Sequence, residues 1–230
     1  PLAARLFSLC TAGGYTIAML ADGRILIHGP GSSEWRTSVE SLGWRDVCVM
    51  GDKLLRLAGG LVKIGPIDDS AILEQLLEVD KRTRRLVATH DGFFVLGPAT
   101  ISKFDSKAGE WRPSFTTELC RLPTGLASDG VWLVVTDHDE GLLAWRVADD
   151  SNAVARCDTI LRHPRSVVPI DDGFVILCDD GIVRWSPNGD TAVLWRDTNI
   201  QSIYSLGPGV LEVSTSNLAY WSPTVGRRVH

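Results

Sequence analysis

The sequence predicts an all-β fold made of six small antiparallel sheets, and this prediction rests on three observations. A unit of about 39 residues recurs six times along the 230-residue chain. Short β-branched and aromatic runs alternate with Asp-Gly and Asn-Gly turns, a pattern typical of hairpins. Each unit also carries a tight turn after its first strand, at residues 12–14, 51–52, 91–92, 129–130, 172–173 and 207–209. This period and grammar predict a six-bladed β-propeller of four-stranded antiparallel blades.

The repeat predicts one propeller domain over residues 1–230, because repeat units bury their apolar faces only against their neighbours. The expected blades are approximately 1–41, 42–82, 83–119, 120–160, 161–198 and 199–230. All six are whole and in order, so no blade is expected to combine strands from both ends of the chain. The start at Pro1, without an initiator Met or an apolar leader, predicts a domain excised from a longer protein or a processed chain.

The fifth unit shows the strand pattern most clearly, with expected strands at 166–170, 174–178, 182–185 and 192–196. The first unit repeats it at 6–10, 15–20, 24–27 and 34–39, and the last strand is expected at 227–230. Residues 71–79 are ambiguous, because their apolar positions also fit one face of a helix. We favour a strand there, since the repeat requires the fourth strand of the second blade.

Large side chains occupy equivalent positions in the third strands, which predicts packing between blades. These positions are His28, Ile64, Phe104, Trp145, Trp185 and Trp221. By the same argument His28 is expected to be a packed histidine and not a ligand. Three Trp-Arg pairs fall on the expected outer strands, where the Trp would cover the blade edge and the Arg would stay solvated. They are Trp35–Arg36, Trp111–Arg112 and Trp195–Arg196.

Composition excludes several classes of protein. The formal net charge of -5 argues against a general nucleic-acid binder, which needs a basic face. No apolar run approaches 18 residues, so no membrane span is expected. The cysteines are odd in number and none are spaced as CxxC, which argues against a disulfide framework or a zinc site. Cys10, Cys48, Cys120, Cys157 and Cys178 are therefore expected to be small buried residues in a reducing, cytoplasmic compartment.

The starts of the six first strands give the main candidate site. The residues there are Arg5, Arg45, Arg85, Thr124, Arg165 and Gln201. The first strand of a blade lies nearest the propeller axis, so these residues are expected to surround the channel mouth. Four guanidinium groups there would attract an anion: a carboxylate, a phosphate or an acidic peptide. Alternatively, each Arg pairs with a nearby acidic residue and holds the loops; the candidates are Asp46, Asp137, Asp139, Glu140, Asp179 and Asp180.

A second cluster, Asp137, His138, Asp139 and Glu140, lies in the expected second turn of the fourth blade. Its oxygen donors are of the kind that bind calcium, but the spacing differs from the Asp-x-Asp-x-Asp-Gly loop. We expect an acidic hairpin turn, and neither a metal nor a cofactor.

No enzyme is expected. His90, His138 and His163 have no nucleophile placed by a recognisable elbow motif. Propeller hydrolases and lactonases hold a metal in the channel, whereas the Arg residues expected at this mouth would repel a cation.

Two segments resemble known repeats. Residues 9–29 resemble one repeat of the regulator-of-chromosome-condensation type, and residues 44–51 followed by 54–65 are similar to a tectonin repeat. The tectonin resemblance implies a six-bladed lectin that binds glycans at its turns. Each resemblance covers a single blade, so the six-bladed architecture is identified without a particular family.

Together these observations predict a non-catalytic interaction module or scaffold that binds another protein, with an anionic or acidic partner at the channel mouth. A tectonin-like glycan-binding lectin is the first alternative. A metal-dependent propeller hydrolase or lactonase is the second.

Overall fold

The computed structural model describes residues 6–38, 43–67, 75–107, 110–118, 122–147, 155–157, 162–214 and 217–229. Every regular element over these residues is a β-strand. Nothing in the described ranges is a helix of the length and apolarity that a bilayer crossing needs. The chain divides into two compact units, Pro1–Thr117 and Glu118–His230.

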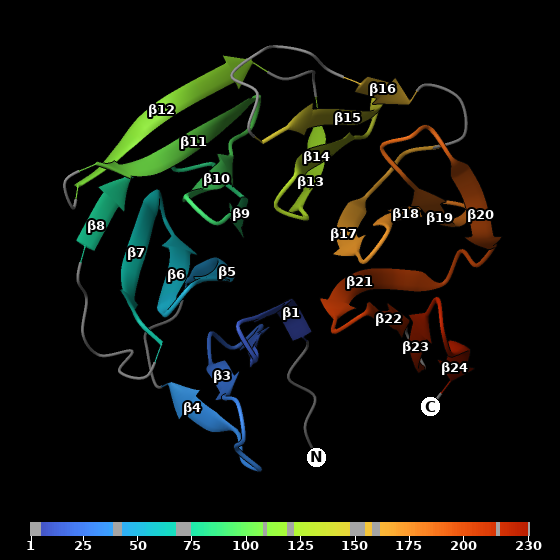
Figure 1. Ribbon diagram of the computed structural model, residues 1–230, viewed down its shortest axis with the longest axis horizontal. Coiled ribbons are helices and arrows are strands. Elements are labelled where there is room, and N and C mark those ends of the chain that lie inside the picture. Colours follow the sequence, from blue (N-terminus) through green and yellow to red (C-terminus); the bar gives the residue numbers. More distant parts are fainter. Residues whose placement is uncertain are drawn as a thin grey trace. The chain divides into compact units, whose positions relative to one another are not determined.

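Unit 1 contains the first three blades (Figure 1). Blade 1 consists of β1 (Leu6–Ala12), β2 (Tyr15–Leu20), β3 (Ile25–His28) and β4 (Arg36–Ser38). Blade 2 consists of β5 (Trp44–Met50), β6 (Lys53–Ala58), β7 (Leu61–Pro66) and β8 (Gln75–Glu78). Blade 3 consists of β9 (Arg85–Ala88), β10 (Gly92–Leu96), β11 (Thr100–Lys107) and β12 (Glu110–Glu118).

Unit 2 contains the other three blades. Blade 4 consists of β13 (Pro123–Ser128), β14 (Trp132–Asp137), β15 (Gly141–Arg146) and β16 (Ala155–Cys157). Blade 5 consists of β17 (Ser166–Ile170), β18 (Gly173–Cys178), β19 (Gly181–Trp185) and β20 (Thr191–Trp195). Blade 6 consists of β21 (Ile200–Leu206), β22 (Gly209–Ser214), β23 (Leu218–Ser222) and β24 (Gly226–Val229).

The fold class predicted from the repeat, a six-bladed β-propeller, is confirmed. Each sheet has four strands in chain order, and the pairs of strands for which a register is described are antiparallel. The first blade uses β1–β4 and the last uses β21–β24, so neither takes a strand from the other end of the chain, as expected.

The predicted strand positions agree closely with the structure in blade 5, where the structural strands begin and end within one residue of the predictions. In the ambiguous segment 71–79, the strand prediction is confirmed for Gln75–Glu78, while residues 71–74 lie outside the described part of the chain. Val62 and Leu77 lie opposite each other in the β7–β8 pair, so this short strand completes blade 2 as the repeat required.

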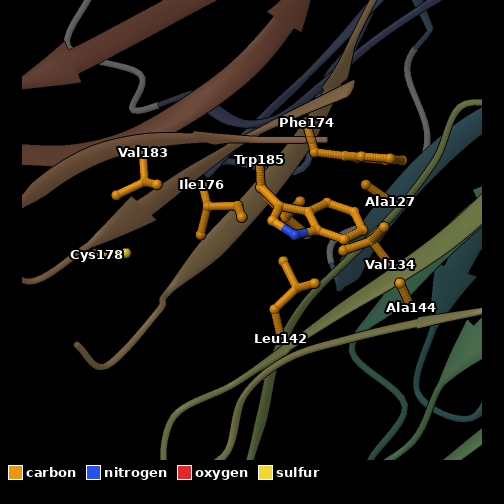
Figure 2. Packing of buried hydrophobic residues seen from close by; sticks show 10 residues of the cluster. Ala127, Val134, Leu142, Ala144, Phe174, Ile176, Cys178, Val183 and Trp185 are labelled. Atoms are coloured by element: carbon orange, nitrogen blue, oxygen red, sulfur yellow. The ribbon is translucent and has the colours of Figure 1, made fainter. Parts of the chain in front are cut away.

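The core consists of apolar layers between consecutive blades. In unit 2, blade 4 contributes Ala127, Val134, Leu142 and Ala144 to one layer, and Figure 2 shows the Trp185 indole of blade 5 directed toward them. Equivalent layers join blades 1 and 2, blades 2 and 3, and blades 5 and 6. Within each unit, consecutive blades therefore bury the sheet faces that they turn toward each other.

Large side chains from the third strands contribute to these layers: Ile64 and Phe104 between blades 2 and 3, Trp185 between blades 4 and 5, and Trp221 between blades 5 and 6. Ile64, Phe104, Trp145 and Trp185 are buried, whereas His28 and Trp221 are half-buried. The His28 ring packs on Trp35, with their centroids 5.3 Å apart. Packing between blades is therefore confirmed for Ile64, Phe104, Trp185 and Trp221, and His28 is a packed histidine, as expected, within its own blade.

The cysteines behave as small apolar residues where their side chains are described. Cys48 and Cys178 are buried and Cys10 is half-buried, and all three are free thiols. Desolvation by burial raises the pKa of Cys10 and of Cys178 to about 12. Cys120 and the side chain of Cys157 lie outside the described part of the chain.

The first strands of successive blades lie side by side within each unit. In unit 1, β5 lies against both β1 and β9, and in unit 2, β17 lies against both β13 and β21. The residues at the starts of these strands therefore meet the segment that leads into the following blade, and this contact positions the candidate site.

Candidate functional site

Asp46, near the start of β5, joins all three blades of unit 1. Its Oδ1 accepts a hydrogen bond from Ser8 Oγ of blade 1 at 2.7 Å, and its Oδ2 accepts one from the backbone N–H of Leu86 in blade 3 at 2.8 Å. Desolvation by burial raises the pKa of Asp46, although the charge of Arg85 and the two hydrogen bonds act in the opposite direction. A buried carboxylate with three neighbours fixes the relative positions of the strands that bind it.

Other residues near the starts of first strands make the same kind of contact with the next blade. Thr124 Oγ1 donates to the carbonyl of Pro164 at 2.6 Å. Arg165 Nη2 donates to the carbonyl of Ile200 at 2.9 Å. Arg45 Nη1 donates to the carbonyl of Lys81 at 3.0 Å. Several residues predicted to bind a ligand therefore also tie consecutive blades together.

The structure describes all but one of the predicted mouth residues, since Arg5 lies outside the described part of the chain. Arg45 and Arg85 belong to unit 1, whereas Thr124, Arg165 and Gln201 belong to unit 2, so each unit presents its own set. Arg45 and Gln201 are exposed.

Two of these arginines have the acidic neighbour that the alternative interpretation requires. Arg85 lies 3.8 Å from Asp46, and Arg165 lies 3.3 Å from Asp179. Both side chains keep more than a third of their surface exposed, at 36% and 38%. They are therefore in reach of a ligand as well as of their carboxylates.

A basic cluster forms where blade 2 leads into blade 3. It contains Arg45 from β5 and four residues of the segment before and at the start of β9, namely Lys81, Arg82, Arg84 and Arg85. Arg85 is half-buried and the others are exposed. Asp80 pairs with Arg82 at 3.1 Å. The positive residues outnumber the acidic ones in contact with them, so this surface is locally basic on an acidic chain.

Repeat alignment identified Arg45 and Arg85 but missed Lys81, Arg82 and Arg84. All three lie in the connecting segment before β9. Arg82 has equivalents in Arg121 and Arg162 of the next two repeats, whereas Lys81 and Arg84 have no basic equivalent in the other repeats. The signal that identifies them is the local density of charge, since four of the five residues from 81 to 85 are Lys or Arg.

The acidic turn of blade 4 is held by hydrogen bonds from backbone N–H groups to the side chain of Asp137. Asp137 is buried, and its Oδ1 accepts hydrogen bonds from the N–H groups of Asp139 at 2.9 Å and Glu140 at 3.1 Å. Its Oδ2 accepts one from the N–H of Leu122 at 2.9 Å. Asp137 thus stabilises a tight turn, which is the structural role expected of an acidic hairpin.

His138 and His163 bring the loops of blades 4 and 5 together. Their rings are parallel, with an interplanar angle of 3° and centroids 4.3 Å apart. His138 Nδ1 lies 2.9 Å from Asp139 Oδ1, and His163 Nδ1 lies 3.2 Å from Asp179 Oδ2. His163 has a φ of 46°, which is uncommon for a residue other than glycine. Sequence analysis did not pair these two histidines, because they are far apart in the chain and in different repeats.

The described residues contain no group of three or more His, Cys, Asp or Glu side chains placed to hold a metal ion. In the His138–His163 stack the two rings face each other in parallel planes, so their in-plane lone pairs do not converge on one point. The chemistry that this arrangement favours is stacking and hydrogen bonding.

The three Trp-Arg pairs differ in exposure. Trp35 is 48% exposed, whereas Trp111 packs on Phe93 and Trp195 packs on Trp221. A tectonin-like lectin requires exposed aromatic rings at several equivalent turns. Trp35 supplies such a ring in blade 1, and the equivalent Trp residues of blades 3 and 5 are half-buried.

The fold and the site together define a β-propeller with a basic cluster in unit 1 and a stacked pair of histidines, His138 and His163, in unit 2. No protein-family model matches the chain, and no curated protein matches it.

Solved structures share its fold at low sequence identity. Virginiamycin B lyase from Staphylococcus aureus aligns with a TM-score of 0.72 and 7% identity, over 98% of this chain and 83% of that chain. A chain of the mitotic checkpoint complex aligns with a TM-score of 0.69 and 16% identity, over 100% of this chain and 84% of that chain. PorZ, a surface component of the type-IX secretion system of Porphyromonas gingivalis, aligns with a TM-score of 0.71 and 12% identity. The match covers 100% of this chain and 33% of PorZ. These similarities support the fold and leave the activity to be argued from the site.

Proposed function

We propose that this protein is a non-catalytic interaction module that binds an acidic segment of a partner protein at the basic cluster of unit 1. The observation that carries the proposal is the excess of exposed positive charge at Arg45, Lys81, Arg82 and Arg84. Propeller neighbours that work within larger assemblies, the mitotic checkpoint complex and the type-IX secretion system, are consistent with an interaction role.

Electrostatics favours this type of partner over a catalytic metal. A cluster of guanidinium and ammonium groups attracts carboxylates and phosphates and repels a divalent cation. The lyase among the structural neighbours shares the fold at 7% identity, which carries no active site to this chain. We also place the module in the cytoplasm, because its described cysteines are free thiols.

The test is a binding measurement with a defined acidic probe. A fluorescein-labelled peptide of twelve glutamates is titrated with the protein at low salt, and anisotropy is recorded. Binding should be saturable. The double variant Lys81→Glu with Arg84→Glu should weaken it at least about tenfold, since two attractive charges become repulsive.

Arg112→Glu is the matched control. Arg112 is an exposed arginine of the same unit, 70% exposed at its side chain and paired with Glu110 on β12. This variant should change the affinity less than twofold, because Arg112 lies outside the basic cluster. Equal weakening by the control and the double variant would show that only net charge matters, and the proposed site would be wrong.

A further inference from the structure

The cations of the basic cluster are not equivalent. Arg82 and Arg85 have carboxylate neighbours, in Asp80 at 3.1 Å and Asp46 at 3.8 Å. Across the described part of the chain, Arg45, Lys81 and Arg84 have no carboxylate within ion-pair distance. These three carry the charge that a ligand would neutralise.

The guanidinium of Arg45 is held in place before any ligand arrives. Its Nη1 donates to the carbonyl of Lys81 at 3.0 Å and lies 3.5 Å from the carbonyl of Thr83. Arg45 nevertheless remains an exposed residue, and a guanidinium has five N–H donors, more than these two carbonyls use. An arginine anchored in this way loses less conformational entropy on binding than a free surface arginine.

The backbone under Lys81 and Arg84 is equally well fixed. Thr83 N–H donates to the carbonyl of Asp80 at 2.9 Å, and Arg82 N–H donates to Asp80 Oδ1 at 2.7 Å. Arg84 N–H donates to the carbonyl of Leu96 in β10 at 2.9 Å. The cluster therefore sits on an ordered turn that is hydrogen-bonded to blade 3.

Lys81 is also positioned by a glycine in the β6–β7 turn. A Cβ placed on Gly60 would lie 2.9 Å from Lys81 Cγ and 3.1 Å from the carbonyl oxygen of Val79. Gly60 has a φ of 91°, a conformation that favours glycine. Because Gly60 has no Cβ, the aliphatic part of the Lys81 side chain can lie close to the β6–β7 turn, at the same end of blade 2 as Arg45.

Three uncompensated cations on a fixed backbone match a ligand group of more than one negative charge. A phosphate monoester carries about -1.5 to -2 charges at neutral pH and three acceptor oxygens, whereas a glutamate carries one charge and two oxygens. Guanidinium groups bind phosphate through paired hydrogen bonds. We propose that the basic cluster recognises a phosphate monoester on a serine or threonine of the partner segment, in preference to a carboxylate. This inference rests on the proposed function and names the group that the same site selects.

The experiment uses three labelled twelve-residue peptides that differ at one central position: serine, glutamate or phosphoserine, in the same acidic background. The intact protein should bind the phosphoserine peptide about tenfold more tightly than the glutamate peptide, and the serine peptide most weakly. In Lys81→Ala with Arg84→Ala, the preference for phosphoserine over glutamate should fall to about twofold or less. Arg112→Ala should keep the full preference. Inorganic phosphate at millimolar concentration should displace the phosphoserine peptide more effectively than sodium acetate at the same ionic strength.

The possible results separate the two proposals. If the glutamate and phosphoserine peptides bind equally and the charge-reversal variant weakens both, phosphate selection is wrong and the proposed function stands. If no peptide binds, both are wrong. If phosphoserine is preferred but the preference survives in the Lys81→Ala/Arg84→Ala variant, the selecting residues lie elsewhere and the inference is overturned. Unchanged circular dichroism and melting temperature of each variant show that lost binding is not lost folding.

Discussion

Asp46 is a residue at which burial and hydrogen bonding act in opposite directions on one charge. Its carboxylate accepts hydrogen bonds from Ser8 and Leu86 and lies near Arg85, all of which favour the charged form. Desolvation favours the neutral form and is the largest influence on its pKa. The residue thus holds three blades together, yet its charge is less favourable in the folded protein than in water.

This balance predicts a specific pH dependence of stability. Because the pKa of Asp46 is raised in the folded protein, the folded state keeps its proton at a pH where the unfolded chain has lost it. The contribution of Asp46 to the free energy of unfolding is therefore greatest below its ordinary pKa of about 3.9. It falls as the pH rises from there through the raised pKa, and then stays constant. Urea denaturation of the wild type and of Asp46→Asn from pH 3 to pH 7 measures this difference.

The Arg85→Ala variant tests whether the pKa of Asp46 causes this pH dependence. Removing the nearby cation should raise the pKa of Asp46 further, so the fall in its contribution should extend to higher pH. A wild-type advantage over Asp46→Asn that grows with rising pH would contradict the prediction. It would mean that Ser8, Leu86 and Arg85 together outweigh the desolvation of the carboxylate.

At the scale of the element, the third strand of blade 5 carries a large side chain that packs in the layer shared with blade 4. Trp185 of β19 is 3% exposed and lies within the layer between blades 4 and 5, where its ring packs near Phe174 at 6.0 Å between centroids. A large aromatic ring at this position fills the space between the two sheets, which the backbones alone do not fill. This indole therefore contributes to the apolar layer that couples the stability of blades 4 and 5.

Trp185→Ala should lower the free energy of unfolding by about 3–5 kcal/mol, the range found when a buried Trp is truncated and leaves a cavity. Denaturant unfolding followed by circular dichroism measures the loss. Trp35→Ala is the matched control, because Trp35 is 48% exposed and packs mainly on His28. That variant should change stability by about 0.5 kcal/mol or less. Similar losses in the two variants would show that the third-strand position has no special role in packing.

The strands could be predicted from the sequence because each one combines a short apolar run with a turn that permits a hairpin. In blade 5 the residues Gly173 and Gly181 have φ values of 144° and 148°, and a Cβ at either would lie within 2.6 Å of a neighbouring backbone oxygen. Only glycine fits there, so the turns are visible in the sequence. Residues 71–79 were ambiguous because their strand is defined by pairing with β7, a contact that local periodicity does not contain.

At the scale of the whole molecule, charge is unevenly distributed. The chain has a formal net charge of -5, yet four of the five residues from 81 to 85 are basic. The acidic partner that we propose would therefore be repelled by much of the protein and attracted by the basic cluster. This contrast would orient the partner as well as bind it.

The consequence is a strong dependence of binding on salt. Exposed charges interact over about 10 Å at 0.1 M ionic strength and over a shorter range at higher salt. The affinity for the peptide of twelve glutamates should therefore fall several-fold between 50 mM and 300 mM sodium chloride, as measured by anisotropy. In the double variant Lys81→Glu with Arg84→Glu, the dependence should vanish or reverse sign. An affinity that does not change with salt would indicate apolar contacts and would contradict an electrostatic site.

The candidate site could be predicted only in part. Alignment of the repeats placed Arg45, Arg85 and Arg165 at equivalent positions, and the structure shows each of them contacting the following blade or a neighbouring carboxylate. The alignment could not identify Lys81 and Arg84, because these basic residues have no equivalents in the other repeats. Nor could it pair His138 with His163, since stacking of two rings depends on how two loops approach each other in space.

The agreement between chain order and spatial order within every sheet has a consequence for synthesis. No strand has to wait for a distant partner, because its hydrogen-bonding neighbours are made immediately before and after it. Closing such short loops demands little entropy, and local pairings form quickly. On the ribosome, each blade can complete its backbone hydrogen bonds while the next is still being translated. Within a unit, the apolar face that packs on the following blade then stays uncovered until that blade emerges.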